Sequence, residues 1–290
     1  MTFSVSSMTA SLKKVAVLQP NKSLKNADPG KWHYGPLFDP SQIEKNHSNF
    51  VQILKDSGAE ILWIPEGDLA IADSIFTYDA SLMTPFGAIL MSPGKLLRRG
   101  EQNIHKKFYK ELNIPIIGQV GNGGLAEAGD TLWLDNKTLI IGRGFRTNPA
   151  GIQQIKEILS PKNITIHIFD LPTYSGESSC LHLMSLISLV DFRSALVFKP
   201  LLPVSLLELL IEKQFSLIEA PVLEFERSNT LSTNVLATSP GKCIMLDSVP
   251  NTLLALEKHG IQVKVFNGDS LCIGCEGGPT CLTRPILREQ

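Results

Sequence analysis

Cys281 stands where a reactive nucleophile would be placed. It follows a Gly-Gly-Pro turn, Gly277 to Pro279, in the stretch GCEGGPTCLTRPILRE. Glycine and proline in such a turn let the backbone approach a ligand closely and fix the direction of the residues that follow. A cysteine near a C-terminus is more often a small buried hydrophobe. The assignment therefore depends on whether the rest of the chain supplies a base, carboxylates and a substrate clamp.

Carboxylates occur at two places where an acid needs a partner. Asp73 and Asp79 lie in ADSIFTYDASLMT, a strand-like stretch in which an unpaired carboxylate is unfavourable. Each could simply form a turn, but two acids on one face of a strand suggest a site for a cation. Glu127 and Asp130 follow in GGLAEAGD, where glycines lead into a strand and leave one carboxylate projecting.

Arginine and histidine residues supply complementary groups. Arg98 and Arg99 precede a predicted helix on a glycine-containing turn, and Arg146 follows in IGRGFRTNPAG. Exposed arginines are usually solvated, but the guanidinium is also the usual fork for a carboxylate. His182 is the one histidine that directly precedes an apolar strand after a glycine-containing loop, SGESSC. By contrast, we expect His105 on a polar helix face.

The composition is that of an ordinary globular protein. The chain has 290 residues, 43% hydrophobic, and a net charge of −1, which gives no indication of a nucleic-acid or membrane surface. Five cysteines without a regular framework favour a reducing compartment. The N-terminus lacks a convincing secretory signal, and no stretch approaches the roughly 18 apolar residues of a spanning helix. We therefore expect a cytoplasmic protein with a single domain over residues 1–290.

The chain repeats one pattern five times. A helix with apolar spacing ends at a polar or glycine break, and an apolar strand follows; these strands start near residues 60, 115, 164, 216 and 261. Further apolar strands, such as GAILMS, TLIIG, SALVF and KCIML, lie between these pairs. Such a period indicates repeated units that bury their faces against one another. We predict five ββαβ units closed into a ring around a central channel. An open α/β sheet is the alternative, but no Gly-x-Gly-x-x-Gly follows the first strand, which we expect at residues 13–18.

A polar segment, residues 19–40, follows that strand. Uncovered loops of this length are uncommon in compact domains and often act as lids. Trp32, His33 and Tyr34 lie in its middle. They either cap a ligand or attach the segment to the body of the protein, and the sequence favours neither.

Six motifs together resemble a known family. In chain order they are DSIFTYD, PGKLLRRGE, EAGD, IGRGFRTN, LHL and GGPTCLT, and they resemble the guanidino-group-modifying enzymes of the pentein superfamily, most closely dimethylarginine dimethylaminohydrolase. The resemblance implies a five-bladed α/β propeller of pseudo-symmetric ββαβ modules, in agreement with the period. It also implies hydrolysis of N-methylated L-arginine to L-citrulline and methylamine or dimethylamine. The resemblance implies a small guanidino compound as the binding partner and allows a homodimer. It implies no cofactor or metal.

The resemblance also implies roles for individual residues. Cys281 would be the nucleophile, His182 the acid and base, and Glu127 the neighbour of the histidine and the guanidinium, while Asp79 would bind the guanidinium nitrogens. A guanidinium is a poor electrophile until carboxylates orient it and a thiolate is held in line. Thiolate attack, protonation of the departing amine and activation of water would release citrulline.

The same resemblance implies a set of contacts at the amino-acid end of the substrate. Asp73 would lie there, and two arginines would hold the carboxylate. The α-amino group would meet backbone. The residues concerned are Asp73, Arg98, Arg146 and the backbone of Leu18 and Cys275.

Three departures from the family pattern leave alternatives open. Tyr78 takes the position of a second acid, which bears on substrate preference. Met184 stands where arginine deiminases carry an aspartate, which disfavours unsubstituted arginine as substrate. Cys272 and Cys275 form a C-x-x-C pair, which alone is a weak signal for a zinc or redox site. Arginine deimination and amidino transfer are the alternative activities, and a non-catalytic propeller is the alternative from another class.

Overall fold

The computed structural model describes residues 2–67, 70–176 and 181–289. Its strands form five three-stranded sheets, and each sheet combines one antiparallel and one parallel pair. In four of the sheets a hairpin leads into a helix, and the helix returns the chain to a third strand parallel to the second; in the fifth, the antiparallel pair joins β15 to β1 and a helix again precedes the third strand. This arrangement is the repeated ββαβ unit that the period predicted.

Four of the units are continuous in sequence. They are β3 Ser81–Thr84, β4 Gly87–Leu90, α4 Glu101–Glu111 and β5 Ile116–Gln119; β6 Thr131–Asp135, β7 Thr138–Arg143, α5 Pro149–Leu159 and β8 Thr165–Asp170; β9 Ile187–Asp191, β10 Ser194–Val197, α6 Val204–Glu212 and β11 Ser216–Glu219; and β12 Leu236–Ser239, β13 Lys242–Leu246, α8 Pro250–Lys258 and β14 Gln262–Phe266. A short helix, α7 Val222–Arg227, joins the last two.

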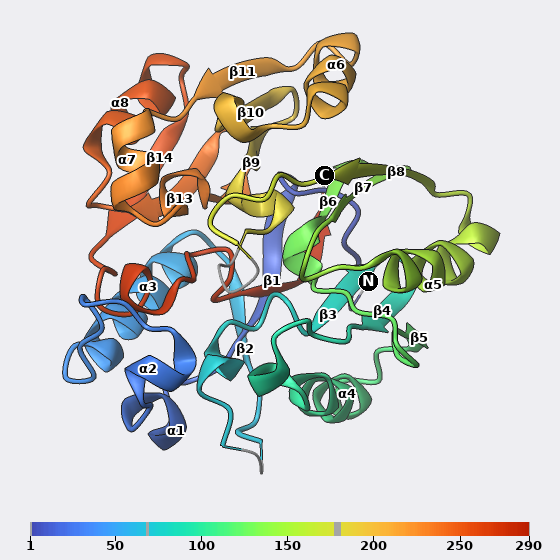
Figure 1. Ribbon diagram of the computed structural model, residues 1–290, viewed down its shortest axis with the longest axis horizontal. Helices are drawn as coiled ribbons and strands as arrows, with labels where there is room; N and C mark the ends of the chain where they lie inside the picture. The colour runs from blue at the N-terminus through green and yellow to red at the C-terminus, as the bar shows by residue number, and fades with distance from the viewer. Residues whose placement is uncertain (1, 68–69, 177–180, 290) are drawn as a thin grey trace.

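The remaining sheet combines both ends of the described chain. Its strands are β15 Arg284–Glu289, β1 Ser11–Val17 and β2 Glu60–Trp63, with α3 Ile43–Asp56 before β2. Ser11 pairs with Glu289 in the antiparallel half, and Lys14 pairs with Glu60 in the parallel half. Figure 1 shows β1 near the middle of the molecule and α4, α5, α6 and α8 at its periphery.

Burial explains why the second strand of each unit reads as a continuous apolar run. All four residues of β4 are buried because the strand is paired on both edges and covered on both faces. The third strand is more exposed, as in β2, and the helix before it buries only one face. In α3 that face carries Ile43, Phe50 and Leu54.

The segment 19–40 is partly helical. It contains α1 Lys22–Lys25 and α2 Pro29–Trp32, whose first turns are capped by the side chains of Asn21 and Asp28. Trp32 and Tyr34 are buried and so attach the segment to the body of the protein.

The predicted strand over residues 72–84 is wrong for its first half. Residues Ala72–Ile75 form a 3-10 turn, and only Ser81–Thr84 are extended in a ladder. The backbone between them bonds to distant segments, since Tyr78 N–H donates to the Cys281 carbonyl at 3.1 Å. Asp73 and Asp79 therefore do not share a strand face.

Two further differences concern histidines. A 3-10 turn, Leu183–Ser185, separates His182 from β9, so the strand begins later than predicted. Residues 177–180 of the loop SGESSC lie outside the described residues. His105 is buried on α4, contrary to the prediction, and its Nδ1 is satisfied there by the hydroxyl of Ser81 at 3.0 Å. No helix in the described ranges is long and apolar enough to cross a membrane.

Candidate active site

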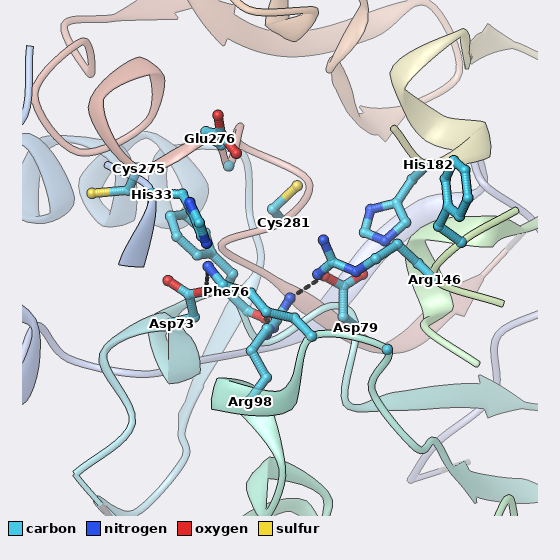
Figure 2. A pocket seen from close by; sticks show the side chains of 14 residues that line it. His33, Asp73, Phe76, Asp79, Arg98, Arg146, His182, Cys275, Glu276 and Cys281 are labelled. Atoms are coloured by element: carbon cyan, nitrogen blue, oxygen red, sulfur yellow. Dashed lines mark hydrogen bonds and ion pairs between the residues drawn. The ribbon is translucent and has the colours of Figure 1, made fainter. Parts of the chain in front are cut away.

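A cavity of about 170 Å³ collects most of the predicted site residues. Figure 2 shows their side chains around one space, with Cys281 and His182 directed toward it from different segments. The polar and charged residues that line it are His33, Asp73, Asp79, Lys95, Arg98, Arg146, His182, Cys275, Glu276 and Cys281.

Close packing of the Gly-Gly-Pro turn places Cys281 at the cavity. A Cβ at Gly277 would lie 2.3 Å from the ring of Phe76, and a Cβ at Gly278 would lie 2.5 Å from the side chain of Asn234. Glycine at both positions therefore lets this turn lie flat against its neighbours. The Cys281 side chain is only partly buried, as a nucleophile that meets a ligand must be.

The imidazole of His182 is held by Glu127. His182 Nε2 lies 2.7 Å from Glu127 Oε2, and the same carboxylate accepts bonds from Arg146 Nε at 3.0 Å and from the backbone of Gly94 at 2.8 Å. Burial alone would raise the pKa of Glu127, but the Arg146 guanidinium and His182 hold it well below its usual range. Glu127 is thus an ionised, fully buried group that orients the imidazole and stabilises its protonated form.

Asp79 is held by Arg98 and by the glycine of the EAGD motif. Arg98 Nη1 donates to Asp79 Oδ2 at 2.5 Å, and the N–H of Gly129 donates to Asp79 Oδ1 at 2.9 Å. A Cβ at Gly129 would lie 2.7 Å from both Asp79 Oδ1 and His182 Nδ1. Glycine at this position therefore lets the carboxylate and the imidazole approach each other.

The Arg98 guanidinium is largely engaged inside the protein. Besides Asp79 it binds both oxygens of Glu101, through Nε at 2.9 Å and Nη2 at 2.8 Å, and the carbonyl of Phe76 at 2.9 Å. Burial opposes the charge of Arg98, but Glu101 and Asp79 keep its pKa well above the usual value. With four N–H groups used, Arg98 retains one for a ligand.

A second basic group, Lys95, lines the cavity beside Asp73. Its Nζ donates to Asp73 Oδ2 at 2.6 Å and to the Trp32 carbonyl at 2.9 Å, and it lies 5.4 Å from the centre of the Trp32 ring. The hydroxyl of Tyr34 donates to the other oxygen of Asp73 at 2.8 Å. The segment 19–40 is thus bound to Asp73, while His33, in the left-handed region at φ 63°, lines the cavity. Sequence reasoning missed Lys95, although it lies inside PGKLLRRGE.

Three other predicted residues lie away from the ligand space. The ring of Tyr78 covers the buried guanidinium of Arg284 at 4.0 Å, so its side chain does not replace the missing acid in the cavity. Leu18 is buried and does not line the cavity either. Asp130 accepts a bond from Leu183 N–H at 2.9 Å, and burial raises its pKa to about 6; it supports the turn that carries His182.

The C-x-x-C pair contributes one residue to the cavity. Cys275 lines it, whereas Cys272 is fully buried, and burial raises the pKa of both thiols. In the described parts of the chain, three potential metal ligands come together at Asp79, Glu127 and His182. The C-x-x-C thiols are not part of that group, and the carboxylates in it already bind Arg98 and Arg146.

Comparison with known proteins shows which enzymes this chain resembles. A family model described as arginine deiminase matches residues 68–206, just under half of the chain. The N(G),N(G)-dimethylarginine dimethylaminohydrolase of Pseudomonas aeruginosa is 25% identical over 251 residues, covering 84% of this chain and 89% of that protein.

Solved structures with similar folds include the Pseudomonas aeruginosa dimethylarginine dimethylaminohydrolase in complex with citrulline. Its TM-score is 0.77 at 22% identity, and the match covers 96% of this chain and all of that one. SxtG, an amidinotransferase from Microseira wollei, has a TM-score of 0.77 at 16% identity, covering 100% and 98% of the two chains. The chain thus has the same α/β fold as these solved structures. The chain is similar to arginine deiminase over residues 68–206 and to this dimethylarginine dimethylaminohydrolase over most of its length, which agrees with the resemblance of its motifs.

Proposed function

We propose that this protein is a cysteine-dependent amidinohydrolase that hydrolyses N-methylated L-arginine to L-citrulline and methylamine or dimethylamine. The observation that carries the proposal is the shared cavity of Cys281 and His182, with His182 bonded to the ionised Glu127. The names of the relatives support the same chemistry, since they are amidine-acting hydrolases.

In the first half of the reaction, the thiolate of Cys281 attacks the guanidinium carbon. Asp79, fixed by Arg98 and Gly129, binds the guanidinium nitrogens and places the carbon in line with the sulfur. The C–N bond to the methylated nitrogen then breaks, and His182 gives a proton to the departing amine. The product of this half-reaction is a covalent amidino group on the sulfur.

In the second half, water replaces the amine. The neutral His182 takes a proton from the water, whose oxygen attacks the amidino carbon. The C–S bond breaks, the sulfur leaves as a thiolate, and citrulline is released. Glu127 stabilises the imidazolium in both halves through its bond of 2.7 Å. Each half-reaction therefore uses the same imidazole in opposite protonation states.

We call Arg146 and Lys95 the basic rim of the cavity, and the amino-acid end of the substrate lies toward it. Arg146 and Lys95 supply the cationic groups that attract the α-carboxylate, and Arg98 acts mainly by holding Asp79. In this proposal the five units form a single-domain propeller around a central channel, and the segment 19–40 covers the ligand as a lid with His33 facing it.

Product analysis separates this proposal from its alternatives. The protein is incubated with arginine and with its mono- and dimethylated forms, and citrulline, ammonia and methylated amines are measured, with Cys281→Ser as the control. We expect citrulline and amine in equal amounts from a methylated substrate. Ammonia from arginine alone would indicate a deiminase. Amidino transfer to an added amine without citrulline would indicate a transferase, the activity named for one structural relative.

A further inference from the structure

The side chain of Asn234 contacts the sulfur of Cys281. Asn234 Nδ2 lies 3.2 Å from Cys281 Sγ, and Asn234 Oδ1 accepts a bond from the backbone N–H of Thr280 at 3.0 Å. A backbone N–H can only donate, so the amide oxygen must face Thr280 and the amide nitrogen must face the sulfur. The hydrogen bond therefore runs from Asn234 to Cys281.

This amide is held in place from several sides. Asn234 is 5% exposed, and the backbone of Gly278 packs directly against it, where a Cβ would lie 2.5 Å from Asn234 Cγ. The glycine before Pro279 thus makes room for the asparagine beside the nucleophile.

The segment of Asn234 is also tied to the segment of His182. Thr233 Oγ1 donates to the Ser185 carbonyl at 2.5 Å, and Ser188 Oγ donates to the Thr233 carbonyl at 2.7 Å. The Ser185 hydroxyl in turn accepts a bond from the backbone N–H of His182 at 3.2 Å. Hydrogen bonds, together with the peptide bond between Thr233 and Asn234, therefore link the nucleophile to the backbone that carries the acid and base.

We propose that Asn234 is a positioning residue that orients the sulfur of Cys281 and stabilises its thiolate. An amide N–H bonds a thiolate more strongly than a neutral thiol, so the contact favours the reactive form. The same asparagine fixes the distance between the nucleophile and His182 through Thr233. This inference rests on the proposed function only for its effect on turnover. The effect on the thiol is independent of any substrate.

The test measures the pH dependence of Cys281 alkylation by iodoacetamide, followed by peptide mass spectrometry. Asn234→Asp keeps the acceptor for Thr280 but loses the donor, and Asn234→Ala loses both without adding charge. We expect the apparent thiol pKa to rise by about one unit in each, so that alkylation at pH 7 slows about tenfold. Asn163→Asp is the matched control, because it adds the same charge at an exposed asparagine on the turn before β8 and should leave the pKa nearly unchanged.

Other charged and titratable groups around the sulfur are common to all these variants. They are His33, Asp73, Asp79, Lys95, Arg98, Arg146, His182, Cys275 and Glu276, which line the cavity, and the buried Cys272. Their contributions cancel when the variants are compared with the wild type. Turnover should show the same dependence on Asn234, with a lower kcat and little change in KM.

A measurement on the wild-type protein guards against variants that do not fold. With selectively labelled asparagine, the side-chain amide signals of Asn234 should shift as Cys281 titrates or is alkylated. Static amide signals, or an unchanged thiol pKa in folded Asn234→Ala, would overturn the inference. If the pKa shifts while no guanidino compound is turned over, the proposed function fails and the role of Asn234 stands.

Discussion

Replacing Arg98 with methionine tests whether this arginine mainly holds Asp79 or mainly binds substrate. The substitution keeps most of the side-chain volume but leaves Asp79 and Glu101 without their cation. Arg98 is 4% exposed and both carboxylates are nearly fully buried, so solvent cannot replace the lost bonds. Breaking such a buried ion pair costs about 3–5 kcal/mol, and we expect the free energy of unfolding to fall by this amount.

Two further variants test whether the expected loss in the free energy of unfolding comes from the buried ion pairs of Arg98. Arg98→Met combined with Glu101→Gln should recover part of the lost stability, because one uncompensated charge is removed with the cation. Arg143→Met is the matched control: this arginine also binds an aspartate, Asp170, but its side chain is 48% exposed. Its loss should cost less than about 1 kcal/mol, since exposed ion pairs contribute little.

Urea unfolding measures the stability of each variant. The ratio kcat/KM on two substrates shows whether Arg98 acts through Asp79 or binds the substrate carboxylate. If Arg98 holds Asp79, turnover should fall similarly for methylated arginine and for a methylated agmatine, which lacks the α-carboxylate. Wild-type stability together with a loss confined to the substrate that has the carboxylate would refute this reasoning. The result would then assign Arg98 to the carboxylate clamp.

The remaining predictions concern the nucleophile, the rim and acid stability. Cys281→Ser should keep the fold but abolish turnover, because a serine alkoxide is far harder to form; residual wild-type activity would exclude Cys281. Arg146→Ala should lower kcat/KM at least about tenfold on methylated arginine and less on its agmatine counterpart; equal losses would argue against a rim clamp. Burial lowers the pKa of His47 to about 4, and an unfolded histidine titrates near 6.5. The unfolded state therefore takes up the proton first as pH falls from about 6.5 to 4, and the free energy of unfolding should decrease over this window. His47→Asn should flatten the decrease; an unchanged slope would show that His47 is not its cause.

The sequence predicted the repeated units well because their signal is local. Each helix and following strand is encoded by apolar spacing within about twenty residues, and the structure has α3, α4, α5, α6 and α8 where this spacing places them. At the start of α5, Asn148 caps the first turn by accepting a bond from Gly151 N–H and Pro149 takes the first helical position, where both residue types are favoured.

The site was predictable only through its motifs, because its partners come from distant segments. The residues next to Asp79 in the sequence do not indicate that its carboxylate is bound by Arg98 and Gly129, both distant along the chain, instead of lying on a strand face. The direction of the Tyr78 ring depends equally on Arg284, which is distant in the sequence. Asn234 offered a weak signal, a polar amide two residues before the buried strand β12, which is an unusual place unless its hydrogen bonds are met.

The nucleophile sits just before the strand that joins the two ends of the described chain. Cys281 precedes β15 by three positions, and β15 is paired with β1, at the opposite end of the sequence. During synthesis, the four sheets built from contiguous segments can form before this strand has left the ribosome. The sheet that contains β1 can be completed only after β15 has been synthesised. Cys281 reaches its place near His182 when β15 pairs with β1. A chain that lacks β15 would therefore leave the sheet of β1 incomplete and would leave Cys281 without the strand that places it beside the cavity.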